Sequence, residues 1–449
     1  MIGRRTMLQL LSSGAAAVAF RKPLMAAVTQ SAAEHFFIFI HASGGWDVTL
    51  WADPRNERKG LVEPASTDNT DVGPLSRWKP AKLDGDTDTF EILAPADVSL
   101  RFGPGIGDLY DLRDRLTIVN GLAMNTVSHP DGTAYSATGR HLAGGRPPAS
   151  SIDVALANEL GTGQLLPDVA IGFPASYVGE RLDRRAIPLR VSNAGTIAKS
   201  LARADAYLKD DDRAAITAVL TDEAHALAQR SVYPETYERL ASQDQALPHL
   251  LGNELKAAFT PKALMDAYPG LDYKAKNLGA GALGAAFAVE AMKRNLVRCV
   301  GFALGGLDTH NQNYKQHAHT LQELFGTIGS LVRLLDATPH PTKSSTKLSE
   351  RTHILVFSDF CRTPQINLAG GRDHYPNNSA LVISPRFRAG RAFGRTDAEQ
   401  LLPADAKLAF DDGPRPIAPP DLLATFLHAF AIEPRTYLRD GEVVKDMLA

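Results

Sequence analysis

The chain of 449 residues has only two cysteines, Cys299 and Cys361. So small a number excludes a scaffold stabilised by disulfides. Cys299 lies inside an apolar run and is expected to pack as a small hydrophobic side chain. A redox protein that uses Cys361 is the least favoured functional class, because no second cysteine lies near it in the sequence.

A basic stripe and a long apolar segment are also missing. The formal net charge is -2, and without basic runs interleaved with aromatic residues nucleic acid is not an expected partner. The mildly apolar run at 8–20 is too short and too rich in Ala, Gly and Ser to span a membrane stably. Hydrophobic residues make up 44% of the chain and charged residues 22%, which is typical of a globular protein with a sizeable core.

The first 33 residues have the features of an export signal. Arg4 and Arg5 precede the short apolar run, a pattern that resembles a twin-arginine signal peptide. We therefore expect a leader at 1–33, recognition by the twin-arginine export machinery, and a periplasmic or secreted protein. The alternative is a frayed amphipathic helix that carries two arginines by chance.

The rest of the chain alternates between short apolar runs and segments with helical spacing. The apolar runs are bounded by turn residues and predict buried strands at 36–40, 116–119, 168–171, 189–191, 297–304, 353–357 and 380–383. Helices are predicted at 151–160, 321–335 and 422–430, the last with Asp421 as its N-cap. Residues 52–90 are expected to form a surface excursion, and 196–295 a helical section. This alternation predicts an α/β fold, a mainly parallel sheet between helical layers, in a single domain at 34–449.

Polar side chains follow three of the predicted strands. Asp47, Asp308 and Asp359 each lie beside a strand end, His310 follows Asp308 two residues later, and His374 closes the loop that Asp359 opens. Ligands bind at the carboxyl ends of strands in such sheets, and alternate residues of an extended chain face the same way. Imidazoles favour zinc or iron, whereas carboxylates favour manganese, magnesium or calcium. The alternative for each single acid is an ordinary turn residue.

Other polar residues are candidates for the same site. His129 and Asp131 repeat the spacing of Asp308 and His310. Arg362 and Arg372 either hold an oxyanion through bidentate contacts or are solvated or paired with acids.

Three further histidines are given no role in the site. We expect His317 and His319 on a solvated helix face and a structural role for His353, which lies at the start of its strand.

Four segments together resemble a known family. GGWD at 44–47, GGLDTHNQN at 305–313, FSDFCRTPQIN at 357–367 and GRDHYPNN at 371–378 are similar to successive blocks of the secreted family named domain of unknown function 1501. That family is similar to the alkaline phosphatase and sulfatase superfamily. The resemblance implies an alkaline-phosphatase-like fold with one or two metal ions at the sheet edge, beside a Ser, Thr or modified Cys nucleophile.

The resemblance assigns roles to individual residues. It implies the metal ligands Asp47, Asp308, His310, Asp359 and His374, and no cofactor besides a divalent ion: zinc, manganese, magnesium or calcium. The family block usually reads Glu-Phe-Gly-Arg where this chain has Asp-Phe-Cys-Arg at 359–362, and the Cys-x-Pro-x-Arg sulfatase signature is absent. Candidates for catalysis are therefore Ser136 and Thr138 by location, with Thr133 near them, and Arg362 for the oxyanion.

The expected function is that of a metal-dependent hydrolase of phosphate or sulfate esters, acting on a small anionic substrate. The metal ion would polarise the ester and activate a hydroxyl or water. The alternative is a secreted binding or assembly protein that keeps the hydrolase fold without its nucleophile.

Overall fold

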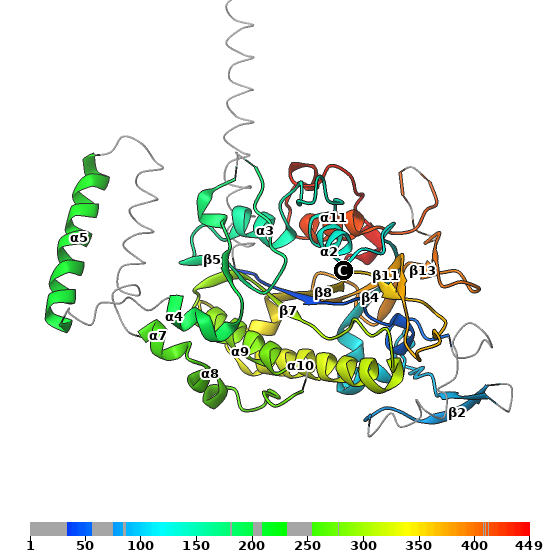
Figure 1. The fold of residues 1–449 in the computed structure, drawn as a ribbon. Helices are drawn as coiled ribbons and strands as arrows, with labels where there is room; N and C mark the ends of the chain where they lie inside the picture. Colours follow the sequence, from blue (N-terminus) through cyan, green and yellow to red (C-terminus); the bar gives the residue numbers. More distant parts are fainter. Residues whose placement is uncertain are drawn as a thin grey trace, which may run out of the picture. The chain divides into compact units, whose positions relative to one another are not determined.

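The apolar runs of the sequence form the strands of one eight-stranded sheet in the computed structural model (Figure 1). The strands follow the order β12-β4-β11-β8-β1-β7-β5-β6. All run parallel to one another except β11, which is antiparallel to both of its neighbours. Their bounds are β1 Phe36–Ala42, β4 Leu116–Ala123, β5 Leu166–Ile171, β6 Leu189–Val191, β7 Val297–Leu304, β8 Thr352–Ser358, β11 Asn377–Ile383 and β12 Arg391–Phe393. The predicted α/β fold with a mainly parallel sheet is confirmed.

The structure describes residues 34–449 except 56–74, 84–86, 180–181, 201–208, 231–253, 277, 407, 409 and 412. The leader predicted at 1–33 lies outside the described residues, and the domain bounds drawn from it stay a prediction. Among the described helices, none is both long enough and apolar enough to cross a membrane.

Helices cover both faces of the sheet (Figure 1). α9 (Gly279–Lys293) and α10 (Ala318–Ala337) lie on one face. α2 (His129–Thr138), α3 (Ile152–Leu160) and α11 (Pro419–His428) lie on the other. The remaining described helices of four or more residues are α4 Ile197–Ser200, α5 Asp210–Arg230, α7 Glu254–Ala258, α8 Pro261–Ala267, the 3-10 segment η2 Pro104–Arg115 and the π-helical turn η5 Asn313–His317.

Strand β1 shows why the sheet needs both layers. Its side chains alternate between the two faces, and all seven residues are buried. Ile38 and Ile40 belong to the larger hydrophobic core, which includes α9 and α10. Phe37 and Phe39 pack on Phe426 of α11, with ring centroids 6.2 and 6.0 Å apart. The continuous apolar run in the sequence is therefore the pattern of a strand covered on both sides.

One local prediction differs from the structure. α11 begins at Pro419 with Ala418 as its N-cap, so the prediction of Asp421 as N-cap was wrong. Proline suits the first turn of a helix because a backbone N–H at that position would have no intrahelical partner. Asp421 lies inside the first turn, where its carboxylate accepts a hydrogen bond from the Ala418 N–H at 2.8 Å. The excursion at 52–90 contains a hairpin of β2 Pro80–Leu83 and β3 Thr87–Phe90.

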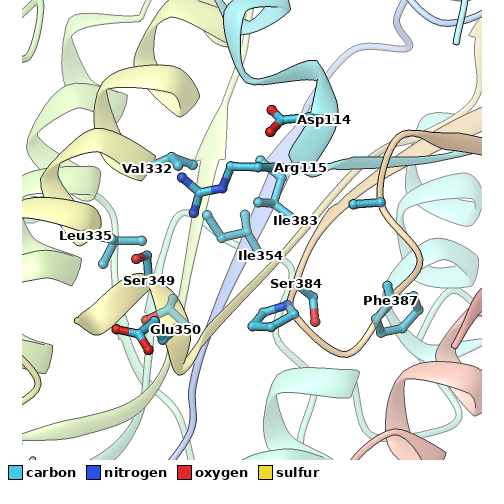
Figure 2. A pocket seen from close by; sticks show the side chains of 13 residues that line it. Asp114, Arg115, Val332, Leu335, Ser349, Glu350, Ile354, Ile383, Ser384 and Phe387 are labelled. Carbon is cyan, nitrogen blue, oxygen red and sulfur yellow. The ribbon is translucent and has the colours of Figure 1, made fainter. Parts of the chain in front are cut away.

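A cavity of about 280 Å³ lies where β4 and β8 begin. Figure 2 shows Ile354 and Ile383 on its wall, with Arg115 reaching across it. The Arg115 guanidinium forms an ion pair with Asp336 at 2.7 Å. This cavity is at the edge of the sheet opposite to the carboxyl ends of the parallel strands, so it is separate from the predicted site.

Candidate metal centre

Three neighbouring strands deliver the predicted acids to one edge of the sheet. β8, β1 and β7 are adjacent and parallel, and Ala42 pairs with both Leu304 and Ser358. The segments carrying Asp47, Asp308 and Asp359 therefore leave the sheet side by side, as the sequence predicted.

Donor atoms of three residues from distant parts of the chain meet at this edge. His129 Nε2 lies 3.1 Å from His374 Nε2 and 3.4 Å from Asp308 Oδ1. His374 Nε2 lies 3.6 Å from Asp308 Oδ1. Ligands that share a tetrahedral ion at 2.0–2.2 Å are about 3.3–3.6 Å apart. These three atoms therefore fit one face of the coordination shell of a metal ion.

His310 adds a fourth donor beside this triangle. Its Nε2 atom lies 3.1 Å from both His374 Nε2 and Asp308 Oδ1. The structure thus brings together three of the five predicted ligands, Asp308, His310 and His374, and adds His129. We call these four residues the candidate metal centre, or metal centre for short.

In each of the three histidines, the hydrogen-bond partner of Nδ1 determines whether Nε2 carries a proton. His374 Nδ1 lies 2.8 Å from the Val127 carbonyl oxygen. His129 Nδ1 lies 2.7 Å from Asp359 Oδ2, and His310 Nδ1 lies 2.8 Å from Asp373 Oδ1. A carbonyl or an ionised carboxylate only accepts, so in the neutral rings Nδ1 carries the proton and Nε2 presents a lone pair. Such outer partners are typical of metal-binding histidines.

The titration of these groups follows from their surroundings. The hydrogen bond to Asp359 raises the pKa of His129, whereas burial lowers the pKa of His374. Burial acts to raise the pKa of Asp308, but the contact with Arg362 and the nearby His129 and His310 together outweigh it, and the net shift is downward. Burial acts to raise the pKa of Asp359 as well. Hydrogen bonds from His129 and His41 outweigh this effect, and the net shift is downward. Both carboxyl groups are therefore ionised at neutral pH.

The structure places Asp359 behind the metal centre. Its carboxylate contacts His41 Nε2 at 2.5 Å, Thr133 Oγ1 at 2.8 Å and the Gly44 N–H at 3.0 Å, in addition to His129. With these four partners around its two oxygens, Asp359 orients His129 rather than facing the donor triangle.

Asp47 lies outside the metal centre as well. It is fully buried, and its carboxylate accepts hydrogen bonds from Asn313 Nδ2 at 2.7 Å and Thr49 Oγ1 at 2.6 Å. Arg372 Nε lies 3.1 Å from the same carboxylate. Gly44 and Gly45 have positive φ angles of 113° and 78°, a conformation that favours glycine. The turn they make carries Asp47 past the strand end into the interior. Asp47 therefore anchors Arg372, which directly precedes Asp373 and His374.

His317 was predicted on a solvated face, and this was wrong. Its ring is fully buried, with Nε2 accepting from the Asp47 N–H at 2.7 Å and Nδ1 lying 2.7 Å from Thr309 Oγ1. Burial lowers the pKa of His317 to about 3. The reason is the π-helical turn η5, which ends at His317 and precedes α10, so the face it presents differs from that of a continuous α-helix.

The remaining predicted roles can be placed by burial. His319 is half-buried. His353 is buried with Nδ1 2.7 Å from Ser384 Oγ, in agreement with its predicted structural role. Cys299 is buried in β7, as expected of a small hydrophobic side chain. Burial raises the pKa of the Cys361 thiol well above its usual value, which disfavours a reactive thiolate.

The hydroxyl groups predicted for catalysis differ in their contacts. Ser136 donates to the Ser358 carbonyl oxygen at 3.0 Å and Thr138 to that of Ala134 at 2.7 Å. Both side chains are buried, so neither is directed at the metal centre. Thr133 is half-buried and donates to Asp359, which it shares with His129.

Arg362, the third predicted catalytic residue, borders the metal centre directly. Its fully buried guanidinium places Nη2 2.6 Å from Asp308 Oδ1 and Nη1 3.5 Å from His310 Nε2.

His129 is the residue that sequence reasoning undervalued. Its spacing to Asp131 repeats that of Asp308 and His310, but Asp131 binds His141 Nδ1 at 2.9 Å and the Leu142 N–H at 2.8 Å instead. The informative signal was position: His129 begins α2 shortly after β4 ends, just as the other polar residues of the site follow strands.

Comparisons with known proteins give a family and two distant structures. The family described as "Protein of unknown function (DUF1501)" matches residues 37–444. No curated protein matches the chain. The structure titled "Crystal structure of Ps i-CgsB in complex with k-i-k-neocarrahexaose" is 12% identical, with 89% of this chain and 72% of that chain covered and a TM-score of 0.35. A structure from work on glycosaminoglycan metabolism by Bacteroides thetaiotaomicron is 10% identical, with 89% and 73% covered and a TM-score of 0.29. Likenesses this distant support no argument about the site.

Proposed function

The chain belongs to the DUF1501 family of proteins of unknown function, and we propose that it is an exported, metal-dependent hydrolase of phosphate or sulfate esters. The observation that carries this proposal is the convergence of lone pairs from His129, Asp308 and His374, with that of His310 beside them. Lone pairs facing one another at 3.1–3.6 Å repel unless a proton or a metal ion lies between them. A divalent ion is the group that fits this donor set.

Different residues of the site would bind the ion and orient its ligands. His129, Asp308, His310 and His374 would hold the ion, which when bound would polarise an ester oxygen and lower the pKa of a coordinated water. Asp359 and Asp373 would orient two of the rings. Their negative charges also increase the basicity of the imidazoles.

Thr133 is the candidate nucleophile in place of Ser136 and Thr138. Its hydroxyl contacts Asp359 at 2.8 Å and lies one helical turn after His129 on the same face of α2. Asp359 would thereby orient the hydroxyl as it orients His129. The buried charge of Arg362 next to Asp308 favours an anionic ester over a neutral one.

A binding or assembly protein is the second candidate. The observation that favours it is that the hydroxyls of Thr133, Ser136 and Thr138 all donate hydrogen bonds within the protein. In that case the metal centre would bind an anion without cleaving it.

The experiment is an assay of metal-stripped protein against aryl phosphates and aryl sulfates, with zinc, manganese, magnesium or calcium added back. We expect turnover only after metal is restored. Thr133→Ala should lower kcat by roughly 10³-fold or more, while Ser136→Ala should have a smaller effect. Folded, metal-loaded protein that binds sulfate or phosphate and hydrolyses none of the esters would favour the binding protein.

The exported location is part of the same proposal and rests on the leader predicted at 1–33. Arg4 and Arg5 replaced together by lysine should leave the protein in the cytoplasm, as measured by cell fractionation. Unchanged accumulation outside the cytoplasm would contradict a twin-arginine signal.

A further inference from the structure

We propose that the metal centre binds its divalent ion and a tetrahedral oxyanion cooperatively, with Arg362 as the residue that couples them. This inference rests on the proposed function, because it presumes that an ion binds between the four donors. It adds that neither ligand binds at full strength without the other.

The starting point is the hydrogen bonding of Arg362. Nε donates to the Gly45 carbonyl oxygen at 2.8 Å, Nη1 to that of Arg372 at 3.1 Å, and Nη2 to that of Gly44. These backbone contacts hold the buried guanidinium in place. The two N–H groups that remain of the five on the side chain face the metal centre, toward His310 Nε2 at 3.5 Å and Asp308 Oδ1 at 2.6 Å.

An ion would compete with Arg362 for one of these acceptors. The Nδ1 proton of His310 is held by Asp373, so Nε2 has a single lone pair. An ion that takes this lone pair leaves one Nη1–H of Arg362 without an acceptor. Asp308 Oδ1 has a second lone pair and can serve both. A buried donor without a partner is unfavourable, and the backbone contacts prevent the guanidinium from turning away to solvent.

The charges oppose binding of the ion alone in the same way. A divalent ion and the Arg362 guanidinium would together bring three positive charges, against the single negative charge of Asp308. The charges of Asp359 and Asp373 lie behind the rings of His129 and His310, where they compensate less. The loaded centre is therefore cationic on its open side.

A tetrahedral oxyanion removes both penalties. One oxygen can accept from the released Nη1–H, which belongs to a planar fork suited to oxyanions. The negative charge balances the ion and the guanidinium. Because linkage is reciprocal, an oxyanion that tightens metal binding is itself bound more tightly by the same factor when metal is present.

The test is titration of metal-stripped, full-length protein with Mn²⁺ or Zn²⁺ by calorimetry, in chloride and in sulfate at equal ionic strength. We expect the metal Kd to be at least about tenfold lower in sulfate, within the usual range of coupling between sites. The reverse titration, sulfate into metal-free and metal-loaded protein, should give the same factor.

Variants separate the coupling from simple electrostatics. Arg362→Gln should bind metal more tightly than the wild type in chloride and show no more than a twofold effect of sulfate. Arg391→Gln, at an exposed arginine of β12, should keep the wild-type coupling. If Arg362→Gln does not fold, the two wild-type titrations decide the matter alone. Metal binding that is equal in chloride and sulfate overturns the coupling and leaves the hydrolase proposal standing, whereas absence of metal binding overturns both.

Discussion

His374→Ala is expected to lower the affinity for a divalent ion by at least about 100-fold, since even the outer partners of metal ligands typically contribute about 10–100-fold. His374 Nε2 lies within 3.6 Å of donor atoms on His129, Asp308 and His310, so it contacts each of the other three donors. The measurement is the metal Kd, together with the rise in melting temperature that added metal produces. A ligand that binds only the folded state stabilises it, and this rise should disappear in the variant.

Two matched variants serve as controls for this result. His319→Ala, at a half-buried histidine of α10, should bind metal like the wild type. Asp47→Asn should lower the melting temperature to a similar extent with and without metal, because it removes the charge partner of the buried Arg372. Full metal occupancy in His374→Ala would contradict the metal centre. Selective loss of metal from Asp47→Asn would restore Asp47 as a ligand.

Asp168→Asn is expected to raise the free energy of unfolding at pH 8 by about 1–3 kcal/mol, the usual size of an uncompensated buried polar group. Asp153 of α3 and Asp168 of β5 are fully buried and interact with each other. Burial raises the pKa of both, and the charge of Asp153 raises that of Asp168 further. Asp153 lies in the first turn of α3, where the helix favours the anion, so Asp168 is the member that keeps its proton.

The pH dependence follows from the direction of these shifts. The folded protein binds a proton that the unfolded chain releases near its ordinary pKa of 3.8. Stability is therefore complete below that pH and declines as the pH rises through the folded-state pKa of Asp168. Asp168→Asn should flatten this decline and differ little from the wild type at pH 4, as measured by urea unfolding. Asp266→Asn, at an exposed acid of α8 paired with Lys262, is the control. Wild-type and Asp168→Asn curves that run parallel from pH 4 to 8 would contradict a proton held by Asp168 in the folded protein.

The sheet could be predicted because its strands are buried on both faces. The run 36–40 is apolar at every position, and the run 297–304 is interrupted by a single charged residue, Arg298. This near-continuity distinguishes a covered central strand from a half-exposed one. β12 was not predicted because its three residues, two of them exposed, carry no such pattern.

The candidate site could be predicted only as far as the sheet edge. The order of the sheet aligns the ends of β8, β1 and β7, so acids that follow them necessarily gather. Which of them faces inward depends on partners far along the chain. Asp47 meets Arg372, and Asp359 meets His41 and His129, and no local spacing shows these pairs. The burial of His317 likewise depends on one π-helical turn that apolar periodicity does not reveal.

We expect His129, Asp308 and His374 to hold one divalent ion, with His310 Nε2 beside them. Anomalous diffraction from crystals of the protein loaded with zinc or manganese tests it most directly. We expect a single strong peak about 2.0–2.2 Å from His129 Nε2, Asp308 Oδ1 and His374 Nε2. A peak elsewhere in the molecule, or no peak while these donor atoms keep their positions, would contradict it.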